Sequence, residues 1–111
     1  MANMDTKSFD LGYAIGIIAT RASFTLDRKS PVIQIKAQEY DSDILEAVKA
    51  QLGGKILGPY RGILIWQARK KDCASALKII KDYLPDGAQY DKLNNWMKRL
   101  AKIGISPMDY L

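Results

Sequence analysis

The sequence predicts an α+β fold in which two β-hairpins form one antiparallel sheet and helices pack against it. Two segments alternate apolar and polar residues and are each split by turn residues, as hairpins are. Four other segments carry apolar residues at helical spacing, so the predicted order is helix, hairpin, helix, hairpin, helix, with an extra C-terminal helix. A chain of 111 residues, 48% of them hydrophobic, fits a single domain over residues 1–111, with its core in about residues 8–100 and a loosely packed tail at 101–111.

The first predicted element is an apolar helix that begins near Ser8 and continues through Ala19. Ser8 is the expected N-cap, with Asp10 in the first turn. The helix is apolar nearly all round, which predicts that it is buried. Gly12, Gly16 and Ala19 share one face, where another helix backbone could approach closely. Each glycine costs about 1 kcal/mol of helix propensity, so the stripe indicates either such an approach or ordinary packing within the chain.

Each predicted hairpin pairs two short strands across a turn. The strands cover residues 22–27, 32–38, 55–57 and 63–69, and the turns cover residues 28–31 and 58–62. Side chains along a strand alternate between the two faces of a sheet. In the second strand, one face consists of Ile33, Ile35 and Ala37, and the other of Gln34, Lys36 and Gln38.

Three further helices are predicted from their apolar stripes. The first is capped by Asp41 or Ser42 and ends at the left-handed pair Gly53-Gly54. The second covers Lys71 to Leu84, and the third covers about Tyr90 to Ala101. The three stripes consist of Ile44, Leu45, Val48 and Leu52; of Cys73, Leu77, Ile80 and Leu84; and of Leu93, Trp96, Met97 and Leu100.

The composition excludes several kinds of chemistry. With no histidine in the chain, Ser-His-Asp triads, Cys-His pairs and histidine-based zinc sites are all excluded. The single Cys73 cannot form a disulfide within the chain, and its place on a helical apolar stripe favours a core residue over a nucleophile. No cofactor is expected. The longest apolar stretch, Leu11 to Thr20, is shorter than the roughly 20 residues that span a bilayer.

Charge and the N-terminus suggest where the protein acts and on what. The N-terminal residues are polar and do not resemble a signal peptide, so we expect an intracellular protein, cytoplasmic or nucleoid-associated in a prokaryote or phage and organellar in a eukaryote. The formal net charge is +5 and the pI is 9.4. These values favour an acidic partner, with nucleic acid first, although a charge of this size is also common among other proteins.

The polar sides of the predicted strands carry the side chains that read nucleic acid. Arginine and lysine pair with guanine, glutamine pairs with adenine, and cations at turns contact phosphates. The alternative is that a sheet with one solvated face simply needs polar residues there. Trp66 alternates with the polar residues and should point to the core, so no stacking platform for single strands is predicted. The candidates for base contacts are Gln34, Lys36, Gln38, Gln67 and Arg69, and those for phosphate contacts at the turns are Lys29, Lys55 and Arg61.

Few residues point to catalysis. The only glycine-rich stretch that resembles a phosphate loop, residues 52–55, follows a helix where a strand is required. Asp27, Glu39 and Asp41 are candidate magnesium ligands. Each is more typical of a solvated or capping charge.

The order of elements and several local sequences resemble the LAGLIDADG homing endonuclease family over about residues 8–100. Ala14 to Ala22 aligns with the nine-letter motif and places Gly16 on the motif's glycine. Further similarity lies in the second strand at residues 31–38, the next helix at 44–54, the third helix at 76–85 and the aromatic Trp96 of the last helix.

The resemblance implies a half-saddle fold that functions as a pair. In this family the motif helices pack together about a two-fold axis and the strands form a saddle over the DNA major groove. A chain with one motif makes the saddle as a homodimer on a pseudo-palindromic site. The implied dimer interface consists of Gly12, Ile15, Gly16 and Ala19.

One departure from the family pattern bears directly on activity. Active members end the motif with an acidic residue that holds divalent metal beside its symmetry mate, and here Arg21 occupies that position, with Ala19 at the motif's other acidic position. An arginine cannot ligate magnesium, so two-metal cleavage should be lost. The family's lysine near the scissile phosphate maps onto Lys78, which leaves Arg21 and Lys78 as further phosphate contacts. The family's polar glutamine position maps onto Gln38 or Glu39.

These observations predict a homodimeric, sequence-specific binder of double-stranded DNA that lacks catalytic and metal-binding residues and acts as a transcriptional regulator. Two alternatives stay open. One is an active endonuclease that uses displaced acids such as Asp27 or Glu39. The other is a non-catalytic interaction or splicing accessory module.

Overall fold

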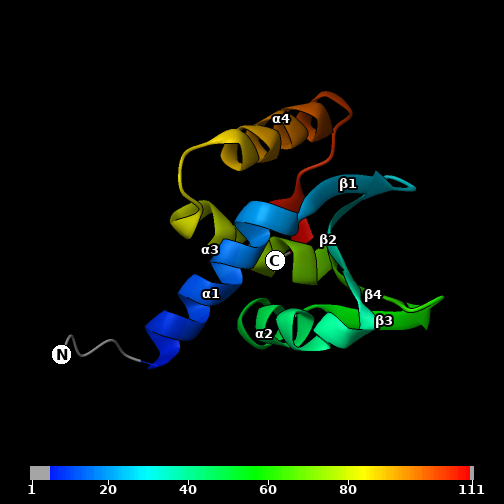
Figure 1. The fold of residues 1–111 in the computed structure, drawn as a ribbon. Helices are drawn as coiled ribbons and strands as arrows, with labels where there is room; N and C mark the ends of the chain where they lie inside the picture. The colour runs from blue at the N-terminus through cyan, green and yellow to red at the C-terminus, as the bar shows by residue number, and fades with distance from the viewer. Residues whose placement is uncertain (1–5, 111) are drawn as a thin grey trace.

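A computed structural model describes residues 6–110, and it confirms the predicted α+β class and element order (Figure 1). The helices are α1 (Thr6–Arg21), α2 (Ser42–Leu52), α3 (Lys70–Tyr83) and α4 (Ala88–Lys102). The strands are β1 (Ser23–Asp27), β2 (Ser30–Gln38), β3 (Lys55–Tyr60) and β4 (Ile63–Arg69). Two 3₁₀ helices, η1 (Glu39–Asp41) and η2 (Pro107–Tyr110), complete the described part.

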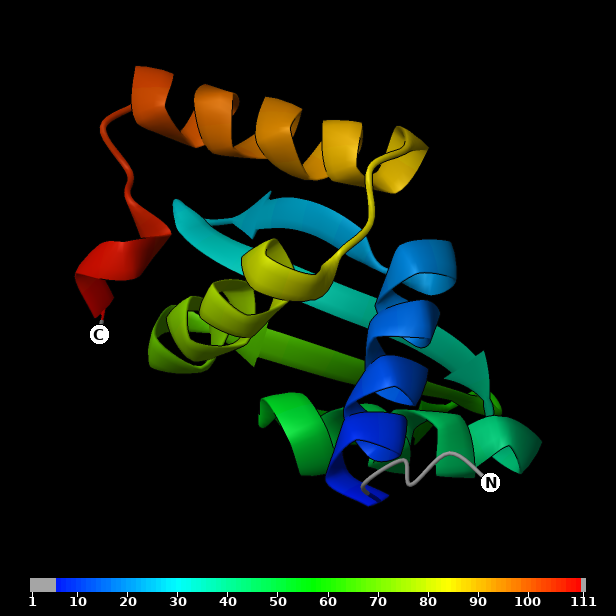
Figure 2. The ribbon, with the colours of Figure 1, turned by 90° about the vertical axis from the view of Figure 1, so that its left-hand side faces the viewer.

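The four strands form one antiparallel sheet in the order β1-β2-β4-β3. Helices α1, α2 and α3 lie on one side of this sheet, and α4 lies alongside β1 at its edge (Figures 1 and 2). No helix formed by residues 6–110 covers the other face of the sheet. None of the helices in this described part combines the length and the apolar character needed to cross a membrane.

The core lies between the helices and the inner face of the sheet. The apolar stripes predicted for α2, α3 and α4 all pack into it, with only Ile44 and Met97 partly exposed. Trp66 is fully buried, as its alternation with polar residues predicted. Its indole Nε1 donates a hydrogen bond to the carbonyl oxygen of Gly53 at 2.8 Å, which ties the end of α2 to β4.

Both hairpin turns are shorter than predicted. Arg28-Lys29 and Arg61-Gly62 form two-residue turns, so the expected turns over residues 28–31 and 58–62 are wrong. All four turn residues have positive φ, between 51° and 80°, as two-residue hairpin turns of type I′ require. Arginine and lysine rarely adopt this conformation, so the turns lack the usual asparagine-glycine signal.

Helix ends differ from the predictions by a few residues. Helix α1 already includes Thr6, so Ser8 lies inside the helix and is not its N-cap. Helix α4 begins at Ala88 and α3 at Lys70, each slightly earlier than predicted. Gly53 has the predicted positive φ of 75°, but its ψ of −154° is not left-handed helical.

Helix α1 is only half buried, so the prediction that it is buried all round is wrong. Ala14, Ile17 and Ile18 face the core, whereas Phe9 is 61% exposed, and Tyr13, which is 49% exposed, lines a shallow depression beside α2. The rest of the described chain does not cover all the apolar side chains of α1. One apolar face of α1 thus lies open to solvent.

The C-terminal tail packs more firmly than predicted. Pro107 is buried, and Ile105 and Met108 pack against the core beside α3. The Ile105 amide donates to the Leu100 carbonyl oxygen at 2.9 Å and turns the chain back from α4. The core therefore extends past residue 100, because Pro107 is buried and Ile105 and Met108 are partly buried against it.

Candidate nucleic-acid interface

A row of polar side chains crosses all four strands on the face that no helix covers. Ser23 pairs with Gln34, Gln34 with Gln67, and Gln67 with Lys55. Directly opposed residues of antiparallel strands point to the same face. Since Trp66 and Ile33 neighbour this row in sequence and are buried, the row itself faces away from the core. The register therefore brings Gln34, Gln67 and Lys55, which were predicted separately, into one line.

One end of this row opens into a depression of about 280 Å³ that Lys55, Gln67 and Arg69 line together with Lys70 and Asp72. Three of the predicted contacts thus share one surface. Arg69 is held there by Asp27, whose Oδ2 accepts a hydrogen bond from Arg69 Nη2 at 2.7 Å. Both partners are partly exposed, so this ion pair is weak enough to exchange with a ligand.

A second depression, of about 340 Å³, lies where α1 ends beside the last residues of β2. Arg21, Lys36 and Gln38 line it, together with Asp41 and several neighbours. Arg21 is in the last turn of α1, where the negative end of the helix dipole favours a cation. This end is also anchored by Gln89, whose Nε2 donates to the carbonyl oxygens of Ile18 at 2.8 Å and Ala22 at 2.7 Å.

Three predicted phosphate contacts lie apart from these depressions. Lys29 and Arg61 occupy the two hairpin turns, which the antiparallel pairing of β2 with β4 places at opposite ends of the sheet. Lys78 is exposed on α3, whose buried side packs on the inner face of the sheet. The fold thus does not bring Lys78 to the polar row.

The outer face also carries apolar residues that were not among the predicted contacts. Leu57, Ile63 and Ile65 are half-buried, and the register sets Ile65 opposite Lys36 and Ile63 opposite Gln38. Ile63 and Ile65 alternate with Trp66 in the same way as Gln67 and Arg69, so strand parity could have found them. Aliphatic side chains beside lysine and glutamine match thymine methyl groups beside base edges.

The donor set near Arg21 does not fit a magnesium site. Magnesium is held by carboxylate oxygens, and Asp41 is the one carboxylate that lines this depression. Asp27, another candidate ligand, is instead bound to Arg69. Across residues 6–110 no three His, Cys, Asp or Glu side chains gather closely enough to hold a metal ion.

Cys73 is placed in the core, as its helical position predicted. It is a free thiol with no exposed surface, and burial raises the pKa of this thiol from its ordinary value of 9.0 to about 12. The nucleophilic form of cysteine is the thiolate. Cys73 therefore stays protonated and unreactive at neutral pH.

A second surface, on the open side of α1, is apolar. A groove of about 380 Å³ runs along Gly12, Gly16 and Ala19 and is completed by Leu11, Ile15, Tyr83 and Pro85. A Cβ built on Gly12 or Gly16 meets no described atom within 4 Å. Packing among residues 6–110 thus does not explain the glycines. Of the four residues predicted for the interface, Ile15 is largely covered by its own chain.

Comparison with known proteins identifies the fold. No protein-family model matches the sequence, and no curated protein matches it. Solved structures do match: I-CpaMI, a LAGLIDADG meganuclease bound to uncleaved DNA, superposes with a TM-score of 0.70 and 19% identity over 84% of this chain and 37% of its own. The homing endonuclease I-TnaI gives a TM-score of 0.68 and 12% identity over 84% of this chain and 72% of its own.

A third match is I-CvuI, a homing endonuclease in complex with the I-CreI target, at a TM-score of 0.60 and 12% identity over 93% of this chain and 80% of its own. This chain therefore spans most of I-TnaI and I-CvuI but little more than a third of I-CpaMI. The predicted resemblance is confirmed for the fold, which is that of the LAGLIDADG homing endonucleases.

Proposed function

We propose that this LAGLIDADG-like half-saddle binds double-stranded DNA in a sequence-specific manner as a homodimer, with the outer sheet face in the major groove. The observation that carries the proposal is the polar row from Ser23 to Lys55 across all four strands, flanked by Arg69 and Lys36. A two-stranded or larger β surface fits the major groove, where glutamine and arginine distinguish base pairs. The meganuclease I-CpaMI, which has a similar fold, is bound to DNA in its solved structure, and this supports DNA as the partner.

The apolar groove on α1 supports the dimer. Two copies that meet along Gly12 and Gly16 bring their helix backbones close together and cover apolar surface on the open side of α1. A self-complementary contact of this kind has two-fold symmetry. The DNA site is accordingly pseudo-palindromic.

Arg21 favours binding over cleavage. It occupies the position at which active members of the resembled family carry an acidic residue. The depression around it is lined by one carboxylate, that of Asp41, and by two cations, Arg21 and Lys36. Two such arginines near the two-fold axis neutralise phosphates directly by charge-assisted hydrogen bonds. A protein that recognises a site without cutting it suits transcriptional regulation.

An endonuclease with displaced acids is the second candidate, and Asp41 is the observation in its favour because it shares the depression with Arg21. A magnesium-dependent nicking assay on supercoiled plasmid separates the two functions. Binding without nicking supports the proposal. Nicking that is lost in Asp41→Ala but retained in Asp27→Ala would establish the enzyme.

Selection of bound sites from a random duplex library tests the proposed function as a whole. We expect enrichment of one palindromic sequence, because the two protomers present the same row to two half-sites. A shift of duplex DNA with no enrichment would contradict sequence specificity. Stronger capture of an RNA competitor than of any duplex would favour a splicing accessory role.

Arg21→Ala should weaken DNA binding by roughly tenfold, to a similar extent for all duplex sequences. The reason is the loss of one phosphate contact per protomer, which also lowers the slope of log K against log salt by about 2 for the dimer. Filter binding at several salt concentrations measures both quantities. Lys81→Ala makes the same change of charge at an exposed position of α3 and should leave the slope unaltered. An unchanged slope in Arg21→Ala would contradict the phosphate role.

A further inference from the structure

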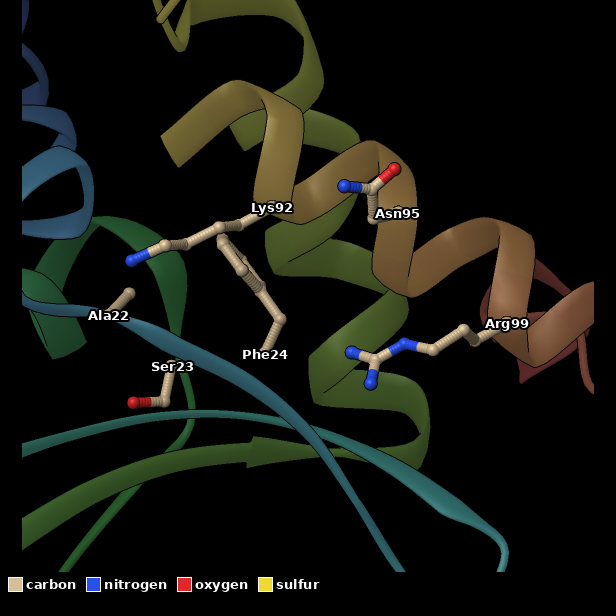
Figure 3. Close-up of a pocket in the computed structure, with 6 residues that line it drawn as sticks. All are labelled: Ala22, Ser23, Phe24, Lys92, Asn95 and Arg99. Carbon is tan, nitrogen blue, oxygen red and sulfur yellow. The ribbon is translucent and has the colours of Figure 1, made fainter. Parts of the chain in front are cut away.

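A groove between β1 and α4 forms a third polar hollow, which no local sequence pattern predicted. Its volume is about 550 Å³. The residues that line it are Ala22, Ser23 and Phe24 of the chain entering and forming β1, and Lys92, Asn95 and Arg99 of α4 (Figure 3).

The α4 side of this groove is positively charged. Lys92, Asn95 and Arg99 follow one another at spacings of three and four residues, so they share one side of the helix. All three are exposed, and Figure 3 shows Lys92 and Arg99 extending from α4 toward β1. The described lining of the groove contains no carboxylate. Within residues 6–110 the one ion pair joins Arg69 to Asp27, so Lys92 and Arg99 have no ion-pair partner there. Two cations therefore face the hollow from α4.

The groove is held in a fixed shape by Trp96. Its indole Nε1 donates to the Thr25 carbonyl oxygen at 2.9 Å, and its ring stacks at a tilt on Phe24 with centroids 5.6 Å apart. Trp96 is buried and lies between Asn95 and Arg99 in the helix, so α4 cannot slide along β1 without breaking this contact. A preformed site loses less entropy when it binds a ligand.

Ser23 connects the groove to the outer face of the sheet. It lines the groove and also begins the polar row through its pairing with Gln34. Since β1 is the edge strand, the groove continues the outer face beyond the edge of the sheet. When a β surface occupies the major groove, the phosphodiester backbone runs past its edges.

We propose that the groove between β1 and α4 binds the phosphodiester backbone of duplex DNA next to the base pairs read by the polar row. This inference rests on the proposed function and adds a backbone contact to it. Lys92 and Arg99 supply positive charge and charge-assisted hydrogen bonds to phosphate oxygens. Because these contacts carry no base information, they fix the position of the sheet on the duplex.

The test compares two double variants of the full chain on one duplex that the protein binds. Lys92→Gln with Arg99→Gln removes the charge of the groove, and Lys98→Gln with Lys102→Gln makes the same change at exposed positions of α4 that do not line it. We expect the groove variant alone to lose roughly tenfold to a hundredfold in affinity for specific and random duplexes, and to lower the salt slope by about 2 to 4 for the dimer. Its hydroxyl-radical footprint should lose protection at the sugars flanking the half-sites.

Equal salt slopes and footprints for the two double variants would overturn the backbone site while leaving the proposed function intact. Failure of the unmodified protein to bind any duplex at low salt would overturn both. Titration with inorganic phosphate tests a free anion as the ligand: NMR shifts at Lys92 and Arg99 that saturate at micromolar phosphate, without duplex binding, would reassign the groove. Matching thermal unfolding of the two double variants shows that any difference between them comes from binding.

Discussion

Replacing Gly12 and Gly16 together by leucine should separate the proposed homodimer into folded monomers and reduce affinity for the palindromic duplex by at least about a hundredfold. A hundredfold loss corresponds to roughly 2.7 kcal/mol. A loss of this size is expected, because each separated monomer binds only one half-site and no longer gains affinity from the linked second half-site. Leucine side chains on both copies would keep the two helix backbones from approaching.

The same substitutions should not harm the monomer. Neither glycine has a described atom within 4 Å of a built Cβ, so the new side chains extend into the open groove. Leucine is also a better helix former than glycine, by several tenths of a kcal/mol to about 1 kcal/mol at each position. Unfolding in urea should therefore show a monomer at least as stable as before, which separates loss of assembly from loss of fold.

Two control variants make this prediction specific. Gly12→Ala with Gly16→Ala raises helix propensity but keeps the surface small, so it should preserve the dimer better than leucine does. Ala101→Leu adds bulk at an exposed position of α4 and should alter neither the mass of the assembly in solution nor the affinity for the duplex. Sedimentation velocity gives the mass and gel shift gives the affinity. A leucine double variant that remains dimeric would contradict the α1 interface.

Much of the fold could be predicted because periodicity is local. The buried stripes of α2, α3 and α4 follow directly from apolar spacing, and the inward direction of Trp66 follows from strand parity. The turns could not be placed as well. Arg28 and Lys29 have positive φ because the pairing of β1 with β2 leaves only a two-residue turn between the strands, and neither residue type is typical of that conformation.

The site shows the same division between local and tertiary information. The sequence predicts that Gln34 and Gln67 face outward, but which residues share a row depends on the register of β2 with β4, and no local pattern sets that register. The groove at β1 could not be found at all from one segment. Its cations lie on α4, about 70 residues after Ser23, and Trp96 brings them there through its contacts with Phe24 and Thr25.

Gly54→Ala should lower the free energy of unfolding by roughly 2–4 kcal/mol, in the range reserved for substitutions that strain a core or a special backbone conformation. A Cβ at this position lies 2.7 Å from the Gln67 carbonyl oxygen and 2.8 Å from the Trp66 Nε1. The first is backbone of β4 and the second belongs to a fully buried ring, so neither can yield cheaply. Gly54 also has a φ of 89°, which alanine disfavours.

Gly53→Ala is the matched control, and the difference between the two variants measures the steric clash at Gly54. Gly53 has a comparable φ of 75° with a ψ of −154°, but no described atom lies within 4 Å of its built Cβ, so only backbone strain of roughly 1–3 kcal/mol applies. Urea unfolding of the two variants measures the difference, and equal midpoints would contradict the clash. The clash also has a functional consequence, because Gly54 precedes Lys55 and lies against the Gln67 carbonyl. A side chain that pushes β3 away from β4 there shifts Lys55 out of the polar row, so Gly54→Ala should weaken duplex binding even at temperatures where the variant is folded.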